Sequence, residues 1–359
     1  MKRRYRVAAF AVVLVLCMSL LAACGPSSNN QPGTETQPPE TQLPETQTPD
    51  QTPTEIPQES EKPEDTRVVK EDYVFEGLGI FQTVANHPDT YTEEATQQGT
   101  VKRVTYNNGT EEKYFNIYLP YRYDSNDDNY NVLYLMHGGG AGSPENFIRE
   151  DRLTALQKVI DNMIQNGDVE PFILVAPSWK TSSVDPSADD YHDNSMELSK
   201  LFAETEFAEY VIPLVDGNYR TNATREGRAF AGFSMGGVTT WNIFLYDLAY
   251  IKYFIPMSGD CWVIEQTGGA TKPEETVAAL EKAVADQGYT GSDFVMYIFT
   301  GTQDYALPNM APQIYAMQDS ELFVFGENTF FGAYVDGVHG DPWSKTYLYN
   351  ALPLLWQND

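Results

Sequence analysis

The feature that most limits the fold of this chain is a regular alternation of short apolar runs with longer stretches of helical spacing. The apolar runs have the length of buried parallel strands, and they span 132–136, 172–176, 228–232, 253–257, 294–300 and 330–335. The helical stretches span 152–166, 195–216, 235–248, 274–287, 311–318 and 341–354. This alternation predicts an α/β fold in which helices cover a doubly wound, mostly parallel sheet.

Two further segments precede the first of these runs. Residues 101–106 and 113–119 alternate or nearly alternate in polarity, and the turn signal Asn107-Asn108-Gly109 lies between them. We therefore expect an antiparallel hairpin at the N-terminal edge of the sheet.

The charge of the chain excludes one class of partner. Against 23 Lys and Arg there are 51 Asp and Glu, which gives a formal charge of -28. Nucleic acid requires clustered cations, so we expect no nucleic-acid partner. Apolar residues make up 42% of the chain, which is enough for a sizeable core.

The N-terminus has the pattern of an export signal. Met1–Arg6 is positively charged, and an apolar run of 17 residues, 7–23, follows it and ends immediately before Cys24. This run is shorter than the ~20 residues that a membrane-spanning helix needs. Leu21-Ala22-Ala23-Cys24 resembles a lipobox, which implies cleavage after residue 23 and a lipid on Cys24. We expect the mature protein on the outer face of the cytoplasmic membrane.

Residues 24–66 are expected to form a tether. Nine prolines and only two aliphatic side chains, Leu43 and Ile56, occur between residues 25 and 66, so no core can form there. Aromatic and aliphatic residues return after Thr66, and a single domain is predicted over 67–359.

The most informative motif is Gly232-Phe233-Ser234-Met235-Gly236. It lies between an apolar run and a helix-like stretch, as the Gly-x-Ser-x-Gly nucleophile elbow requires. A turn this tight leaves no space for a side chain at positions 232 and 236. Ser234 is therefore the candidate nucleophile.

A serine hydroxyl needs a base to accept its proton. In hydrolases of this topology the chain order is Ser, then Asp or Glu, then His. His339 is the only histidine after Ser234, and it lies in a glycine-bracketed loop after the last predicted strand. This order selects His339 as the base, whereas His137 is expected to bond its own loop.

The acid of the triad is less restricted, because thirteen Asp and Glu residues lie between Ser234 and His339. Asp304 follows the predicted strand 294–300 and is the preferred candidate. Asp260 follows the preceding strand and remains the alternative.

The oxyanion of the tetrahedral intermediate needs hydrogen-bond donors. Gly139, in the glycine-rich loop after the predicted strand 132–136, is expected to supply one backbone N–H, and Met235 the other. No phosphate-binding loop, His-Glu-x-x-His helix or dinucleotide motif occurs, so neither a cofactor nor a metal is expected.

Several blocks resemble the esterase D and feruloyl esterase group of carbohydrate esterases, which are often joined to enzymes of plant cell-wall degradation. These blocks are 132–140, 210–220, 228–237, 301–304 and 338–340. The resemblance implies an α/β-hydrolase fold with Ser234, Asp304 and His339 as the triad. It also implies an acylated polysaccharide or oligosaccharide substrate, with feruloyl or acetyl groups on xylan.

The substrate-binding residues are the least defined part of this prediction. Four tryptophans near predicted loops or the elbow helix could stack on a cinnamoyl ring or a sugar: Trp262 foremost, then Trp241, Trp343 and Trp179. Two alternatives remain open. One is an acetyl esterase or acyltransferase acting on cell-wall glycans or other esters, as in enterochelin esterases, and the other is a non-catalytic carbohydrate-binding lipoprotein.

Overall fold

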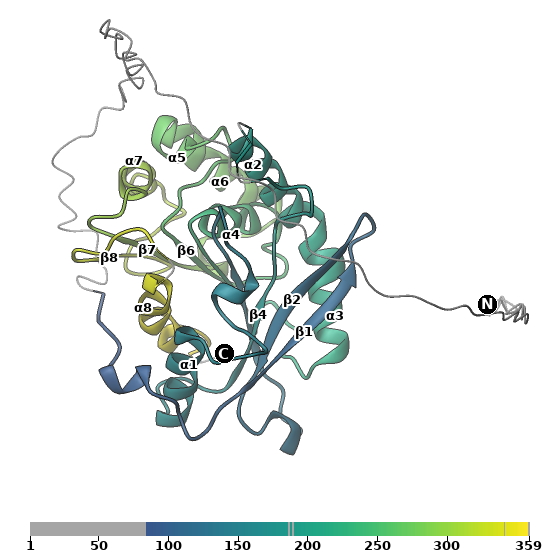
Figure 1. Cartoon of the computed structure of the whole chain (residues 1–359). Helices are drawn as coiled ribbons and strands as arrows, with labels where there is room; N and C mark the ends of the chain where they lie inside the picture. Colours follow the sequence, from purple (N-terminus) through teal and green to yellow (C-terminus); the bar gives the residue numbers. More distant parts are fainter. Residues whose placement is uncertain (1–83, 186, 189, 341, 358–359) are drawn as a thin grey trace, which may run out of the picture. The chain divides into compact units, whose positions relative to one another are not determined.

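The computed structural model describes residues 84–185, 187–188, 190–340 and 342–357 (Figure 1). The predicted signal peptide, Cys24 and the predicted linker 24–66 lie outside the described residues. Within these residues, no helix is both long enough and apolar enough to span a membrane.

An eight-stranded sheet forms the centre of the domain, with strand order β1-β2-β4-β3-β5-β6-β7-β8. The strands are β1 Thr100–Asn107, β2 Glu112–Leu119, β3 Asn131–Met136, β4 Phe172–Ala176, β5 Arg228–Phe233, β6 Tyr253–Met257, β7 Val295–Gly301 and β8 Thr329–Tyr334. β2 is antiparallel to both β1 and β4, and the strands from β4 to β8 in this order are parallel to one another. The predicted α/β fold with an antiparallel edge hairpin is confirmed.

Helices cover both faces of this sheet. They are α1 Ala155–Asn166, α2 Tyr191–Leu201, α3 Ile212–Asn218, α4 Met235–Tyr246, α5 Gly268–Thr271, α6 Pro273–Asp286, α7 Leu307–Gln318 and α8 Pro342–Ala351. The two sides of the sheet have separate hydrophobic clusters: α1 and α8 supply side chains to one, and α2, α3, α4, α6 and α7 to the other. Figure 1 shows α8 beside α1.

The helical stretch predicted over 195–216 is divided in the structure. α2 is followed by a π-helix, η4 (Phe202–Val211), and then by α3. Pro213 lies in the first turn of α3 and has no N–H, so it cannot donate a hydrogen bond to the preceding turn. The predicted stretch is therefore helical throughout, but its π-helical part was not predicted, because apolar spacing does not distinguish helix types.

Candidate active site

Ser234 lies at the sharp turn between β5 and α4. Its backbone has φ 58° and ψ -119°, which an L-residue adopts only when its surroundings impose it. A Cβ added to Gly232 would lie 2.0 Å from the carbonyl oxygen of Gly236, and one added to Gly236 would lie 2.1 Å from that of Met136. The glycines therefore allow the close backbone packing that presents Ser234 at the carboxyl edge of the sheet.

The structure brings Ser234, His339 and Asp304 together from three separate loops. His339 Nε2 lies 2.9 Å from Ser234 Oγ, and His339 Nδ1 lies 2.7 Å from Asp304 Oδ1. Because a carboxylate oxygen accepts, Nδ1 carries the proton and Nε2 is left to accept from the serine hydroxyl. This is the geometry that a Ser-His-Asp triad requires.

Aromatic rings hold the imidazole of His339. The ring of Phe233 packs 4.9 Å from it, and that of Tyr305 stacks at 4.0 Å with an interplanar angle of 28°. Tyr305 follows Asp304 directly in the chain, so one short segment supplies both a hydrogen-bond partner and a stacking partner to the histidine. We did not identify Tyr305 from the sequence.

Asp260, the alternative acid, lies in the same cavity but has other partners. Its Oδ1 accepts a hydrogen bond from Trp262 Nε1 at 2.9 Å, and its Oδ2 accepts one from Gly269 N at 3.1 Å. Burial raises the pKa of Asp260 to about 7, although these two hydrogen bonds act in the opposite direction. The structure therefore brings Asp304 to the imidazole, whereas Asp260 fixes the indole of Trp262.

The two predicted oxyanion donors lie against the nucleophile. Met235 N is at the start of α4, directly after Ser234, where helix N–H groups lack intrahelical partners. The glycine-rich loop passes close by, since a Cβ added to Gly138 would lie 3.3 Å from Ser234 Cβ, and one added to Gly139 would lie 3.1 Å from Met235 Cγ. Both residues line the cavity in front of Ser234, where a developing oxyanion would need hydrogen-bond donors.

His137 holds the start of this loop. It is buried, with Nδ1 2.7 Å from the carbonyl oxygen of Gly138 and Nε2 2.8 Å from Ser178 Oγ. Nδ1 must donate to the carbonyl, so Nε2 accepts from the serine hydroxyl. Burial lowers the pKa of His137 to about 3, which keeps the ring neutral. As expected from the sequence, His137 bonds its own loop and does not contact Ser234.

Two residues missed by the sequence analysis fix the rest of the loop. Lys180 Nζ donates to the carbonyl oxygens of Gly140 and Gly142, both at 2.6 Å, and Gly140 N donates to the hydroxyl of Tyr191. Tyr191 belongs to α2, and a buried hydrogen bond between Ser199 and Thr239 joins that helix to α4. The loop is therefore tied to the same helix that begins at the nucleophile.

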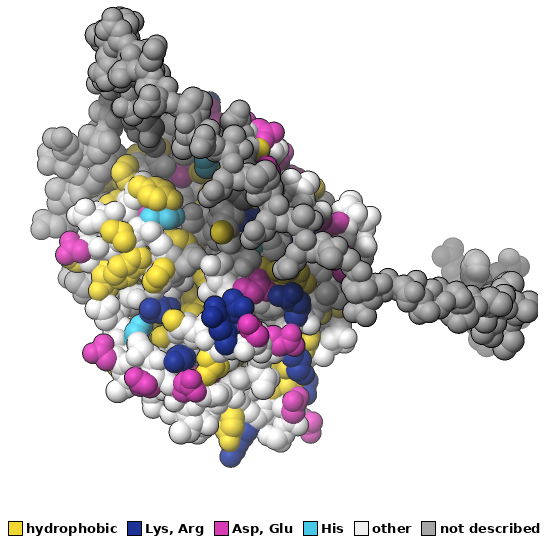
Figure 2. Space-filling model, viewed as in Figure 1, with side chains coloured by type: hydrophobic (Ala, Val, Ile, Leu, Met, Phe, Trp, Pro, Cys, Tyr) yellow, Lys and Arg dark blue, Asp and Glu magenta, His cyan; other side chains and the backbone are white. Residues whose placement is uncertain are grey.

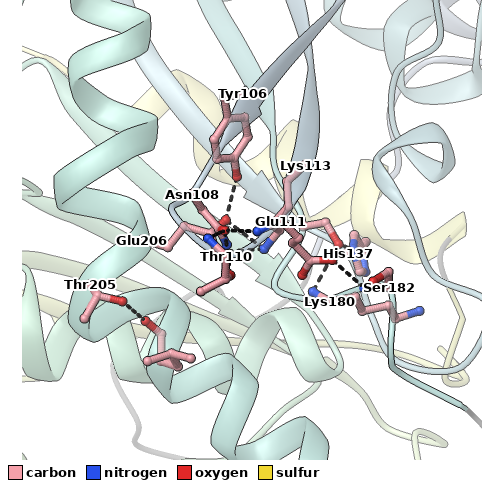
Figure 3. Close-up of polar contacts among 12 residues, drawn as sticks. Tyr106, Asn108, Thr110, Glu111, Lys113, His137, Lys180, Ser182, Thr205 and Glu206 are labelled. Carbon is pink, nitrogen blue, oxygen red and sulfur yellow. Dashed lines mark hydrogen bonds and ion pairs between the residues drawn. The ribbon is translucent and has the colours of Figure 1, made fainter.

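A buried ion pair ties the edge hairpin to the helical layer beside this loop (Figure 3). Lys113 Nζ lies 2.7 Å from Glu206 Oε1, and Tyr106 donates to the same carboxylate. Next to this pair, Glu111 accepts a hydrogen bond from Ser182 N, in the segment that carries Lys180. The hairpin is thus bonded to η4, which follows the helix of Tyr191, and to the segment that carries Lys180. Tyr191 and Lys180 are the two side chains that hold the glycine-rich loop.

A cavity of about 450 Å³ opens in front of Ser234. Trp262 lines it, as predicted, but Trp241 does not, because this side chain is 1% exposed in the core and donates to the carbonyl oxygen of Gly259. Trp343 packs 4.6 Å from Tyr334 outside the cavity, and Trp179 is buried beside His137. The expectation that Trp241 and Trp343 contact substrate is therefore corrected.

Exposed apolar side chains lie in the loops on either side of the catalytic histidine. Tyr305, Val335 and Val338 are 71%, 60% and 50% exposed, and they lie in the loops that carry Asp304 and His339. Figure 2 shows hydrophobic side chains gathered beside a histidine on one part of the molecular face. In the described part of the chain, no group of His, Cys, Asp and Glu side chains is arranged to hold a metal ion.

Comparisons with known proteins agree with this geometry. The Esterase family model, "Putative esterase", matches residues 107–262. The structure superimposes with a TM-score of 0.66 on a serine-to-alanine variant of the feruloyl esterase module from Clostridium thermocellum in complex with sinapinate. That module is 31% identical to this chain, and the match covers 77% of this chain and 94% of the module. The chain belongs to the feruloyl esterase family. It is a serine carboxylic-ester hydrolase, which sets aside the non-catalytic alternative.

Curated relatives of this feruloyl esterase family member are larger proteins. Endo-1,4-beta-xylanase Y of Acetivibrio thermocellus is 33% identical over 283 residues, which is 74% of this chain and 24% of that protein. The endo-1,4-beta-xylanase/feruloyl esterase of Xylanibacter ruminicola is 33% identical over 159 residues, which is 42% of this chain and 20% of that protein. The chain thus spans about a quarter or less of the length of these relatives.

Proposed function

We propose that this protein removes feruloyl groups esterified to xylan-type plant polysaccharide. The observation that carries the proposal is the hydrogen-bonded set Ser234, His339 and Asp304, which opens on a cavity with aromatic side chains in its wall. Two named relatives support the feruloyl group and the xylan backbone, because one is a feruloyl esterase module and the other a xylanase/feruloyl esterase.

The reaction is a two-step acyl transfer. Ser234 Oγ attacks the ester carbonyl while His339 Nε2 takes its proton, and the imidazolium then gives this proton to the departing alcohol. Water attacks the acyl-enzyme in the second step with His339 again as base, which releases the acid and restores the serine. Asp304 keeps the proton of the neutral imidazole on Nδ1, so that Nε2 faces the serine in both steps.

The negative charge of each tetrahedral intermediate falls on the former carbonyl oxygen. The N–H groups of Met235 and Gly139 are the donors in this proposal, and each is worth roughly 3 kcal/mol of transition-state stabilisation in comparable sites. Lys180 and Tyr191 act indirectly, since they form hydrogen bonds with the glycine-rich loop and not with the oxyanion. Their task is to keep the loop in place when charge develops.

The aromatic acyl group is held by Trp262. Its indole lines the cavity, and its Nε1–H is already bonded to Asp260, so the ring is fixed before substrate arrives. A fixed aromatic wall favours a planar cinnamoyl ring over a small acetyl group. The exposed side chain of Tyr305, which also lines the cavity, supplies further aromatic surface.

Substrate preference tests this proposal. The purified chain is expected to release ferulate from methyl ferulate and from feruloylated arabinoxylan, with a higher kcat/KM for methyl ferulate than for 4-nitrophenyl acetate. Trp262→Ala should raise the KM for methyl ferulate by about tenfold with little effect on the acetate ester. Trp343→Ala, outside the cavity, is the matched control. Release of acetate from acetylated glycans without ferulate release would contradict the proposal and favour the acetyl esterase alternative.

We further propose that the protein is lipid-anchored through Cys24 and acts outside the cell. The support is the sequence alone: a cationic head, a 17-residue apolar run and Leu21-Ala22-Ala23-Cys24. More than one acyl chain is needed for stable membrane attachment, as expected for a processed lipoprotein. Cells that express the unsubstituted protein are expected to incorporate labelled palmitate into it, and Cys24→Ala should abolish this labelling. Equal labelling of the unsubstituted protein and of Cys24→Ala would contradict the anchor.

A further inference from the structure

A second cavity, of about 400 Å³, lies at the opposite edge of the sheet from Ser234. It is lined by Asn129, by Asn131 at the start of β3, by residues 221–224, 226 and 227 just before β5, and by Trp356 near the C-terminus. β3 and β5 are neighbours in the centre of the sheet, and the glycine-rich loop and Ser234 follow their other ends. At about 3.3 Å per residue, six-residue strands separate the two cavities by roughly 20 Å. This cavity is therefore distinct from the catalytic one.

Two asparagine side chains present a donor and an acceptor to this cavity. Asn222 Nδ2 donates to Asn131 Oδ1 at 2.7 Å, and this bond fixes both amides. The amide N–H groups of Asn131 and the carbonyl Oδ1 of Asn222 are left to a ligand, and both residues line the cavity. A sugar hydroxyl both donates and accepts, so neighbouring hydroxyls of one sugar suit such a pair.

Thr224 adds a second donor to the same wall. Its Oγ1 accepts from Gly227 N at 3.2 Å, so its own hydroxyl proton is available. The charged side chain on this wall is Glu226, which lies 3.7 Å from Arg225 in an ion pair. Amides and a hydroxyl dominate the polar lining, which favours a neutral ligand over an anion.

Trp356 supplies the apolar part of the cavity. Its backbone is left-handed, with φ 57°, which is strained for a residue with a bulky side chain. Packing against Phe172 at 5.7 Å and Tyr253 at 6.3 Å holds the ring in place. An aromatic surface beside amide and hydroxyl groups matches a sugar ring, which has apolar C–H faces and a polar edge.

We propose that this second cavity, lined by Asn131, Asn222, Thr224 and Trp356, binds a neutral glycan segment without catalysing any reaction on it. The proposal goes beyond the proposed function and rests on it only for the choice of polymer. A polysaccharide held here would stay near the catalytic cavity after each ester is cleaved, which raises its effective concentration. The site would therefore lower the KM for a polymer and leave the reaction of a small ester unchanged.

Retention of the full chain in a native gel that contains arabinoxylan tests the proposal, with Ser234→Ala as parent to prevent turnover. When Asn222→Ala or Trp356→Leu is introduced into this parent, its affinity for arabinoxylan is expected to fall about fivefold or more, because each change removes at least one contact with the glycan. Asn166→Ala, an exposed asparagine at the end of α1, is the matched control and should be retained like the parent. Equal retention of all variants, or no retention of the parent, would overturn the proposal.

Kinetics of the active chain separate this proposal from the proposed function. Asn222→Ala should raise the KM for feruloylated arabinoxylan and leave kcat/KM for methyl ferulate unchanged; an unchanged polymer KM would count against the glycan site. If the unsubstituted chain does not cleave methyl ferulate, the proposed function fails while the gel assay still decides the glycan site. If Trp356→Leu lowers the melting temperature, Asn222→Ala alone decides.

Discussion

Ser234→Ala is expected to lower kcat for methyl ferulate by a factor on the order of a million, the loss seen when the nucleophile of a comparable triad is removed. The reason is that His339 Nε2, 2.9 Å from Ser234 Oγ, would have no hydroxyl to activate. The fold should be retained, because the change removes one exchangeable hydrogen bond worth about 1 kcal/mol. Stopped assays at high enzyme concentration measure the rate, and thermal unfolding measures the stability.

Ser258→Ala is the matched control for this experiment. Ser258 lines the same cavity and also has a positive φ, 52°, but it has no bond to His339 among the described residues. Its replacement should change kcat by less than about tenfold. Full loss of activity in Ser258→Ala together with retained activity in Ser234→Ala would overturn the assignment of the nucleophile.

The sequence was sufficient for the fold and for two members of the triad because these depend on local order along the chain. The strands are short, apolar and separated by helices, so their sequence positions predict a parallel sheet whose carboxyl ends meet. Ser234 is bracketed by glycines that the backbone packing requires, and His339 is the only histidine in the required interval. No knowledge of side-chain packing was needed for these residues.

The remaining residues of the site depend on distances that a sequence does not contain. Asp260 and Asp304 each follow a strand, and both are buried, yet only Asp304 reaches His339. Lys180 and Tyr191 contact the glycine-rich loop from about 40 and 50 residues further along the chain. Their residue types carry no periodic or motif signal, and only the tertiary structure shows which backbone groups they meet.

Trp241 and Trp262 show the same limit. Both lie within ten residues of the end of a strand, and the sequence favours both as substrate contacts. Trp241 lies on α4, and the packing of this helix buries its side chain. Trp262 lies in a loop and lines the cavity. The face on which a helical residue lies becomes clear only when the neighbours of the helix are known, and α4 is buried on nearly all sides.

Asp304→Asn is expected to reduce kcat by about ten-thousandfold while leaving substrate binding nearly unchanged. The asparagine amide would donate to His339 Nδ1, which moves the imidazole proton to Nε2. The ring would then present a donor, and not an acceptor, to Ser234. Kinetics at several pH values, together with ferulate binding, measure the separate effects on kcat and KM.

Asp260→Asn is the matched control, because this carboxylate lies in the same cavity and differs in its partners. It should change kcat by less than about tenfold, since Asp260 contacts Trp262 and Gly269 but not His339. A loss of kcat in Asp260→Asn equal to that in Asp304→Asn would show that the acid of the triad is wrongly assigned.

The same control makes a separate prediction about stability, whose sign follows from the raised pKa of Asp260. Burial raises this pKa from 3.8 to about 7, so the folded state holds the proton across a pH range in which the unfolded state has lost it. Ionisation therefore favours unfolding, and the contribution of Asp260 to the free energy of unfolding falls as the pH rises from about 4 to about 7. Asp260→Asn should remove this decline and make the protein relatively more stable above pH 7, as urea unfolding at each pH would show. A decline of the same slope in both proteins would mean that Asp260 does not titrate in this range.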